Sequence, residues 1–153
     1  DYTQGAMRNA TRGNYRPVNS EPMSQGTRCR QLAQYVIFDS PVNMLCDSPS
    51  NYMKEKECTD FIANVPEIWD ETRGLEGKVG EYICMSRRSG EDWYVGGMTN
   101  WSARELAVDM SYIALPLSSR CQIKNVKVGD IAPTKYTHDS IENHTLSIST
   151  VTM

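Results

Sequence analysis

A single short apolar strand between two amphipathic helices is the feature that most limits how this chain can fold. Residues 24–39 place apolar side chains at helical spacing on one face, and a second such helix is predicted over residues 49–65. The apolar run at residues 42–46 lies between them and predicts a buried strand. Because a lone strand cannot complete its own hydrogen bonds, this order is typical of the closing units of a parallel α/β structure.

Capping rules predict where these helices begin. Ser24 or Thr27 is predicted to cap the first helix, and Ser48 followed by Pro49 predicts the start of the second. Residues 1–23 carry scattered glycine and proline with no apolar period, and are predicted to form a loop. A loop of this length in a compact domain is usually functional or borrowed from a larger structure.

The second half of the chain changes to the period of β-strands. Residues 79–88 and 93–99 predict a hairpin around a turn at residues 89–92. Further strands are predicted over residues 105–110, 121–128 and 145–151. Short antiparallel strands joined by turns favour a sandwich or a barrel.

The boundary between the two halves is predicted in the glycine- and glutamate-rich segment 72–77. It divides the chain into a strand–helix part at residues 1–76 and an antiparallel β domain at residues 77–153. The fold class is therefore α+β.

Charge and cysteine content exclude several classes of function. The 153 residues include 16 basic and 19 acidic side chains, a net charge of −3, which predicts no nucleic-acid partner. No apolar run approaches the roughly 20 residues that a membrane helix needs. The five cysteines form no CxxC pair, so free, mostly buried thiols are expected rather than a zinc or redox site.

Carboxylates at strand ends are the first candidates for chemistry, because glycoside hydrolysis uses a pair of them. Asp47 directly follows the predicted strand at residues 42–46, and Asp1 could lie in the loop of the preceding strand. The alternative is that Asp47 caps the next helix or turn. The two histidines, His138 and His144, suggest no third ligand, so neither a metal site nor a nucleophilic triad is predicted.

Aromatic side chains in the second half are candidates for stacking on sugars. Trp93 and Trp101 could offer an indole face to a pyranose ring. Strand alternation puts Trp93 and Tyr94 on opposite faces of the sheet, so one of them is expected in the core. The pair Gly96-Gly97, inside the same strand, predicts a bulge or a close backbone approach.

Seven blocks of sequence together resemble glycoside hydrolase family 97. They run in the order of that family over residues 1–110, whereas the match after Met110 is looser. The blocks are residues 1–7, 22–28, 43–49, 57–62, 65–72, 77–82 and 93–101.

The resemblance implies an α-glucosidase or α-galactosidase with an amino-terminal β-sandwich, a central (β/α)8 barrel and a small carboxy-terminal β-sandwich. This chain would hold the last strand–helix units of the barrel and the final sandwich. The resemblance also implies a calcium ion held by glutamates and export to the periplasm or the exterior. The family's catalytic and calcium-binding carboxylates precede the block at residues 1–7, so no catalytic residue and no metal ligand are expected here. Asp1, Tyr2, Thr3 and Asp47 are expected near the substrate-binding mouth.

The chain departs from the family pattern at Gln4, where proline is expected, and at residues 147–153, which lack a glycine-rich final strand. Three hypotheses remain open. The first is the carboxy-terminal part of an α-glycoside hydrolase, inactive alone, whose partners are an α-linked oligosaccharide and the remainder of the same polypeptide. The second is a stand-alone carbohydrate-binding sandwich. The third is an inert truncated product.

Overall fold

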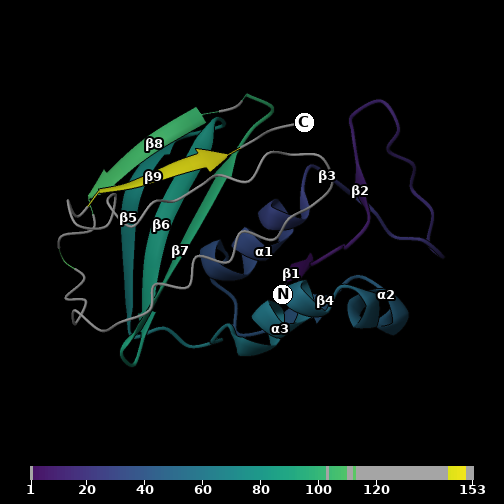
Figure 1. The fold of residues 1–153 in the computed structure, drawn as a ribbon, viewed down its shortest axis with the longest axis horizontal. Coiled ribbons are helices and arrows are strands. Elements are labelled where there is room, and N and C mark those ends of the chain that lie inside the picture. Colours follow the sequence, from purple (N-terminus) through teal and green to yellow (C-terminus); the bar gives the residue numbers. More distant parts are fainter. Residues whose placement is uncertain (1, 103, 110–111, 113–144, 151–153) are drawn as a thin grey trace.

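The computed structural model of the chain describes residues 2–102, 104–109, 112 and 145–150. Short strands and three helices come first, and antiparallel strands follow (Figure 1). In chain order the elements are β1 (Tyr2–Gln4), β2 (Asn9–Ala10), β3 (Ser24–Gln25), α1 (Arg28–Ile37), β4 (Asn43–Leu45), α2 (Pro49–Lys54), α3 (Lys56–Asn64), β5 (Glu71–Lys78), β6 (Tyr82–Ser89), β7 (Asp92–Thr99), β8 (Arg104–Asp109) and β9 (Thr145–Thr150).

The strand predicted between the helices is confirmed as β4, and it has one partner among the described residues. β4 pairs in parallel with β1, so that Tyr2 lies opposite Asn43 and Gln4 opposite Leu45. The prediction of a continuous loop over residues 1–23 is therefore wrong at β1, and also at β2, which pairs in parallel with β3. These strands have two or three residues each, too few for an apolar period to mark them.

The prediction that this strand is buried is also wrong. Val42, Met44 and Leu45 are 55%, 46% and 54% exposed. Pleating places Thr3 and Met44 on one face of the β1–β4 pair and Gln4 on the other. Helix α1 lies on the Gln4 side, and its Tyr35 hydroxyl donates to the Gln4 carbonyl. Parallel sheets are normally covered on both faces, so the Thr3–Met44 face is the side on which covering structure is expected.

The helices begin where capping predicts. Thr27 is the cap of α1, its side chain accepting a hydrogen bond from the Arg30 amide, and Ser48 caps α2 with Pro49 in the first turn. The single helix predicted over residues 49–65 is instead two helices, α2 and α3, which meet at Glu55 with φ −101° and ψ 53°. The Thr59 hydroxyl donates to the carbonyls of Tyr52 (2.7 Å) and Glu55 (3.1 Å) and stabilises this break.

The predicted hairpin is confirmed as β6 and β7, in antiparallel register from Tyr82 opposite Thr99 to Ser89 opposite Asp92. The segment at residues 72–77, where the domain boundary is predicted, is part of β5, which pairs antiparallel with β6. Its glycines are tolerated on a strand that has one neighbour in the sheet and whose register shifts between Gly74 and Glu76. The predicted division at residues 76 and 77 thus falls within a strand.

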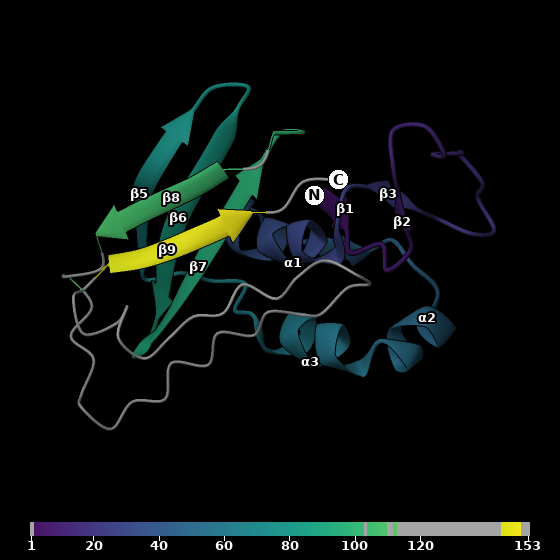
Figure 2. The ribbon, with the colours of Figure 1, turned by 45° about the horizontal axis from the view of Figure 1, so that its top comes forward.

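The three-stranded sheet lies between a helix and a second pair of strands. Helix α1 packs on one face along β7, and the β8–β9 pair crosses the other face, as Figures 1 and 2 show from two directions. Val108 of β8 is 2% exposed. This arrangement is compatible with a β-sandwich. The strand predicted over residues 121–128 lies outside the described residues.

A small core joins the three helices. Met7, Leu32, Tyr52 and Cys58 are buried together, and Phe61 and Ile62 pack against them. Cys58 and Cys84 are buried free thiols, as predicted, whereas Cys46 is half-buried and Cys29 is exposed. Burial raises the pKa of both the Cys58 and the Cys84 thiol to about 11, so neither is a reactive thiolate near neutral pH. None of the described helices has the length and apolar character needed to cross a membrane.

Candidate functional site

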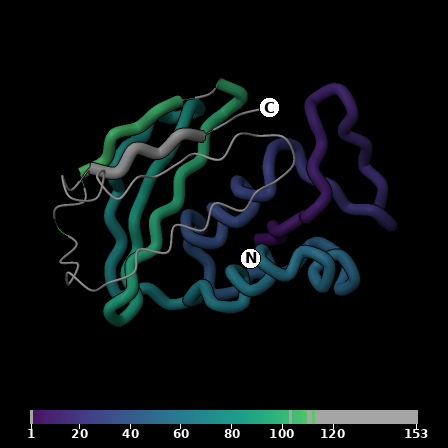
Figure 3. The backbone as a smooth tube through the Cα atoms, in the orientation of Figure 1, coloured from purple at the N-terminus to yellow at the C-terminus, as the bar shows by residue number. Residues whose placement is uncertain are grey.

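The carboxyl ends of β1 and β4 form the candidate site. In parallel strands these ends meet at one edge, and here they bring the segment Gly5–Met7 beside Asp47. From this edge the chain runs out into a long excursion before it returns to α1 (Figure 3). An ion pair between Arg8 and Glu21 joins the two sides of this excursion.

Two buried tyrosines clamp the backbone at the start of this segment. The Tyr35 hydroxyl donates to the Gln4 carbonyl (3.1 Å), and the Tyr52 hydroxyl donates to the Gly5 carbonyl (2.9 Å). The Gly5 amide donates to Gln31 Oε1 at 2.9 Å. Gly5 has φ +94°, and a Cβ there would lie 2.6 Å from the Tyr35 hydroxyl, so this close fit requires glycine.

Asp47 uses both carboxylate oxygens to hold the same segment. Its Oδ2 accepts from the Met7 amide (2.8 Å), and its Oδ1 accepts from the Ser48 amide (2.7 Å) and the Asn51 side-chain amide (2.7 Å). Asp47 therefore contacts the first turn of α2, in line with the alternative prediction, while Ser48 is the cap of that helix. These three donors occupy three of the roughly four acceptor positions of the carboxylate.

An ion pair extends the clamp to the helix ends. Arg28 donates through Nε to the Met7 carbonyl (2.5 Å) and through Nη1 to Glu55 Oε2 (2.9 Å). It therefore links the loop after β1 to the junction of α2 and α3. We call this set the clamp: Tyr35, Tyr52, Asp47 and Arg28. It orients a backbone segment and contains no pair of unengaged carboxylates.

The predicted mouth residues fall in different places. Asp1 lies outside the described residues. Tyr2 stacks on Phe38, with ring centroids 4.5 Å apart, and Thr3 is exposed on the face opposite α1. Gln4, where the family resemblance leads us to expect proline, is 3% exposed and donates to Asn43 Oδ1 at 2.7 Å. A substrate-mouth role for Asp1, Tyr2, Thr3 and Asp47 stays a prediction.

The two candidate sugar-stacking residues differ in environment. Trp93 packs edge-on against Tyr112 (centroids 5.1 Å apart), whereas Tyr94 packs against Trp69 (5.3 Å), which confirms that they occupy opposite faces. Trp101 is 39% exposed, with the Arg12 guanidinium 5.3 Å from its ring centroid. Sugar stacking stays a prediction for both indoles, and Trp101 is the more accessible.

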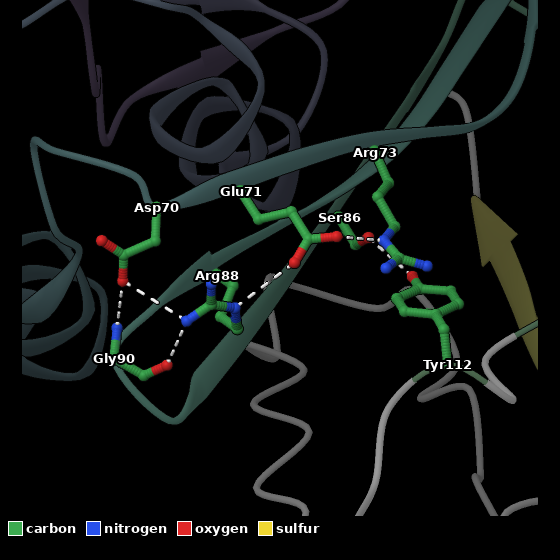
Figure 4. A network of polar contacts seen from close by, with 7 residues as sticks. All are labelled: Asp70, Glu71, Arg73, Ser86, Arg88, Gly90 and Tyr112. Atoms are coloured by element: carbon green, nitrogen blue, oxygen red, sulfur yellow. Dashed lines mark hydrogen bonds and ion pairs between the residues drawn. The ribbon is translucent and has the colours of Figure 1, made fainter.

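A polar network covers the face of the sheet that carries Trp93 (Figure 4). Arg73 lies 5.7 Å from the Trp93 ring and 4.2 Å from the Tyr112 ring, and its Nε donates to Glu71 (2.5 Å). Hydrogen bonding from Arg73 lowers the pKa of the Glu71 carboxyl. The Ser86 and Tyr112 hydroxyls are 2.6 Å apart. These groups satisfy one another on a partly exposed face of the sheet, which indicates a structural role.

The clamp also contains residues that sequence reasoning did not single out. Gln31, Tyr35 and Tyr52 act on backbone groups 26, 31 and 47 residues away. Their helical spacing predicts a core face but not the partner of a polar tip. Within the described part of the chain, no group of three or more histidine, cysteine or carboxylate side chains could hold a metal ion.

Raising the pH is expected to loosen the clamp. Burial raises the pKa of Tyr52 to about 12, and burial also raises the pKa of Tyr35. Since these folded-state pKa values exceed the ordinary value near 10, the stability they contribute is complete below pH about 10 and is lost as the pH rises toward 12. Urea denaturation between pH 8 and 12 should show this loss, and Tyr52→Phe should make it smaller. Parallel loss in both proteins would contradict the assignment.

Comparison with known proteins gives the family. Residues 68–151, more than half of the chain, match the family model described as "Glycosyl-hydrolase 97 C-terminal, oligomerisation". Over 113 residues the chain is 67% identical to a retaining α-galactosidase of Bacteroides thetaiotaomicron, covering 74% of this chain and 17% of that protein. The chain therefore spans about a sixth of the length of this relative.

Solved structures agree with this match. A family 97 glycoside hydrolase from Pseudoalteromonas sp. strain K8, in complex with panose, is 30% identical with a TM-score of 0.52, covering 56% of this chain and 14% of that one. A β-arabinopyranosidase is 34% identical with a TM-score of 0.51, covering 54% and 14%. The chain belongs to glycoside hydrolase family 97 and corresponds to the carboxy-terminal part of its members.

Proposed function

We propose that this chain is the carboxy-terminal, non-catalytic part of a retaining α-galactosidase, in which the β domain braces the last strand–helix units and mediates self-association. The identity with the Bacteroides α-galactosidase supports this specificity over an α-glucosidase. The family description supports self-association. In the whole enzyme the Thr3–Met44 face would pack against the remaining strands of a (β/α)8 barrel.

One observation carries the bracing role: the sheet is interlocked with α1. Gly96 of β7 lies so close to α1 that a Cβ would be 2.9 Å from Ile37 Cγ1. The buried Arg87 of β6 donates to the carbonyls of Ile37 (3.3 Å) and Phe38 (3.4 Å) at the end of α1. A stand-alone binding module would not need a helix from the preceding unit as part of its own packing. The sandwich therefore fixes α1, and through the Tyr35 hydroxyl it fixes the edge that carries the clamp.

Two further parts of this proposal concern the whole enzyme. Calcium is proposed as its cofactor from the family resemblance, with ligands outside this chain; Asp47, at the carboxyl end of β4, is engaged by three protein donors. A periplasmic or secreted location is proposed from the family resemblance.

The test is hydrolysis of an aryl α-galactoside by the purified chain alone and by the whole hydrolase that contains it. We expect no rate above background from the chain and turnover from the whole enzyme. In the whole enzyme, Asp47→Asn should lower the melting temperature, because it weakens the hold on the Met7 amide. Enzyme-like turnover by the chain alone, abolished by Asp47→Asn without a change in melting temperature, would show that Asp47 is catalytic.

The alternative function is glycan binding by the sandwich, and it would rest on Trp101, which is 39% exposed, because the Trp93 ring packs against Tyr112. Isothermal titration with melibiose and maltooligosaccharides tests it. Saturable binding that Trp101→Ala abolishes would support this alternative.

A further inference from the structure

Two turns at one end of the sheet present large apolar side chains to solvent. Val79, in the turn between β5 and β6, is 103% exposed, and Trp101, after β7, is 39% exposed. Figures 1 and 2 show both turns at the end of the sheet away from α3. We call residues 78–81, 100–102 and 104 the end surface.

The end surface is held rigid by hydrogen bonds between its turns. The Asn100 amide donates to the Glu81 carbonyl (2.7 Å), and the Asn100 side chain donates to the Gly80 carbonyl (3.4 Å). The Ser102 amide donates to Asn100 Oδ1 (2.9 Å), and the Thr99 hydroxyl donates to the Ser102 carbonyl (2.9 Å). Preorganised apolar side chains lose little conformational entropy on binding a partner.

Charges of both signs surround the apolar side chains. Lys78 Nζ lies 2.5 Å from Glu81 Oε1, and Arg104 Nη2 lies 2.9 Å from Glu81 Oε2. The Arg12 guanidinium adds a positive charge beside Trp101. In a two-fold interface each surface meets its own copy, and a surface with charges of both signs can be complementary to itself. A nucleic-acid or strongly acidic partner would instead require one sign of charge.

We propose that the end surface binds the end surface of a second copy of this chain, with Val79 and Trp101 at the centre and the charged side chains at the rim. This inference rests on the proposed function, since self-association is the role in the family description, and it names the surface responsible. Tryptophan and arginine are the residue types that most often dominate the energy of protein interfaces.

A second exposed apolar surface provides the rival explanation. Met44 is 46% exposed on the β1–β4 pair, which in the proposed function faces the rest of the barrel. Association through that face would be an artefact of isolating the chain. Met53, 82% exposed on α2, is apolar but belongs to neither surface.

The experiment is sedimentation velocity over a range of micromolar concentrations, on the chain and on four single variants. We expect a dimer whose dissociation constant rises about tenfold or more in Val79→Glu, as loss of a central apolar contact implies. Met44→Glu and Met53→Glu should leave it unchanged. Because Val79 is fully exposed, Val79→Glu should keep the melting temperature of the chain. Trp101→Ala gives a second, independent reading of the same surface.

Several results would overturn the inference. These are a monomer at every concentration, a dimer that Met44→Glu dissociates and Val79→Glu does not, and a dimer insensitive to both Val79→Glu and Trp101→Ala. Loss of melibiose binding in Trp101→Ala with an unchanged dimer would assign the surface to glycan instead. The hydrolysis assay tests the proposed function, and sedimentation tests the interface. A catalytically active chain would therefore contradict the proposed function, and the sedimentation result would still decide whether the end surface forms the dimer.

Discussion

Arg87→Ala is expected to lower the free energy of unfolding by about 3 kcal/mol, the cost of deleting a buried side chain that satisfies helix-end carbonyls. Arg87 is 3% exposed and donates to the carbonyls of Ile37 (3.3 Å) and Phe38 (3.4 Å). Its guanidinium also lies 5.6 Å from the Trp69 ring. The ion pair with Asp39 at 3.6 Å contributes little, because the Asp39 side chain is 92% exposed. Urea denaturation followed by tryptophan fluorescence gives the measurement.

The neighbouring arginine is the matched control. The Arg88 side chain is 32% exposed and forms ion pairs with Asp70 (3.5 Å) and Glu71 (3.4 Å) near the surface (Figure 4). Arg88→Ala should therefore cost about 1 kcal/mol or less. Equal losses in the two variants would mean that the contact with the end of α1 does not hold the sheet in place.

Elements with strong local signals could be predicted from the sequence. The β6–β7 hairpin has Gly90 at φ +60° in its turn, and α2 has Ser48 followed by Pro49 at its start. These signals act within a few residues, so the turn and the helix start that they specify do not depend on distant parts of the chain. The apolar period likewise located α1 and β4.

Elements fixed by distant partners could not be predicted. The sequence predicts a boundary rather than a strand at β5 because its glycines weaken the strand pattern, and its strand conformation depends on pairing with β6. β1 has only three residues and depends on β4, about 40 positions later. The break at Glu55 depends on the Thr59 hydroxyl, which the apolar period does not register.

The candidate site likewise contains one residue that the sequence located and others that it did not. Asp47 could be located because it follows a strand, and its hydrogen bond to the Met7 amide shows a structural contact that the sequence did not predict. The tyrosine clamp could not be located, because Tyr35 and Tyr52 reach backbone carbonyls 31 and 47 residues away. The one long-range prediction that succeeded is Gly96, where a glycine inside a strand indicated a close approach.

Gly96→Ala is expected to destabilise the chain by about 2 kcal/mol, typical of overpacking a filled contact. The new Cβ would lie 2.9 Å from Ile37 Cγ1, 3.0 Å from Val36 Cβ and 3.2 Å from the Ala33 carbonyl oxygen. None of these atoms is the flexible end of a side chain, so α1 as a whole must move away from β7. Hydrogen exchange should therefore accelerate in α1 as well as in β7.

Gly74→Ala in β5 is the matched control for this prediction. Nothing lies within 4 Å of a Cβ built at Gly74, and its backbone is not left-handed. Alanine there should be neutral or stabilise the chain by up to about 1 kcal/mol, because it restricts the unfolded chain more than glycine does. If both substitutions destabilise the chain equally, the lost stability comes from replacing glycine by alanine in this sheet and not from the contact with α1. If only Gly96→Ala does so and exchange in α1 rises with it, the contact between β7 and α1 is what joins the sandwich to the strand–helix units.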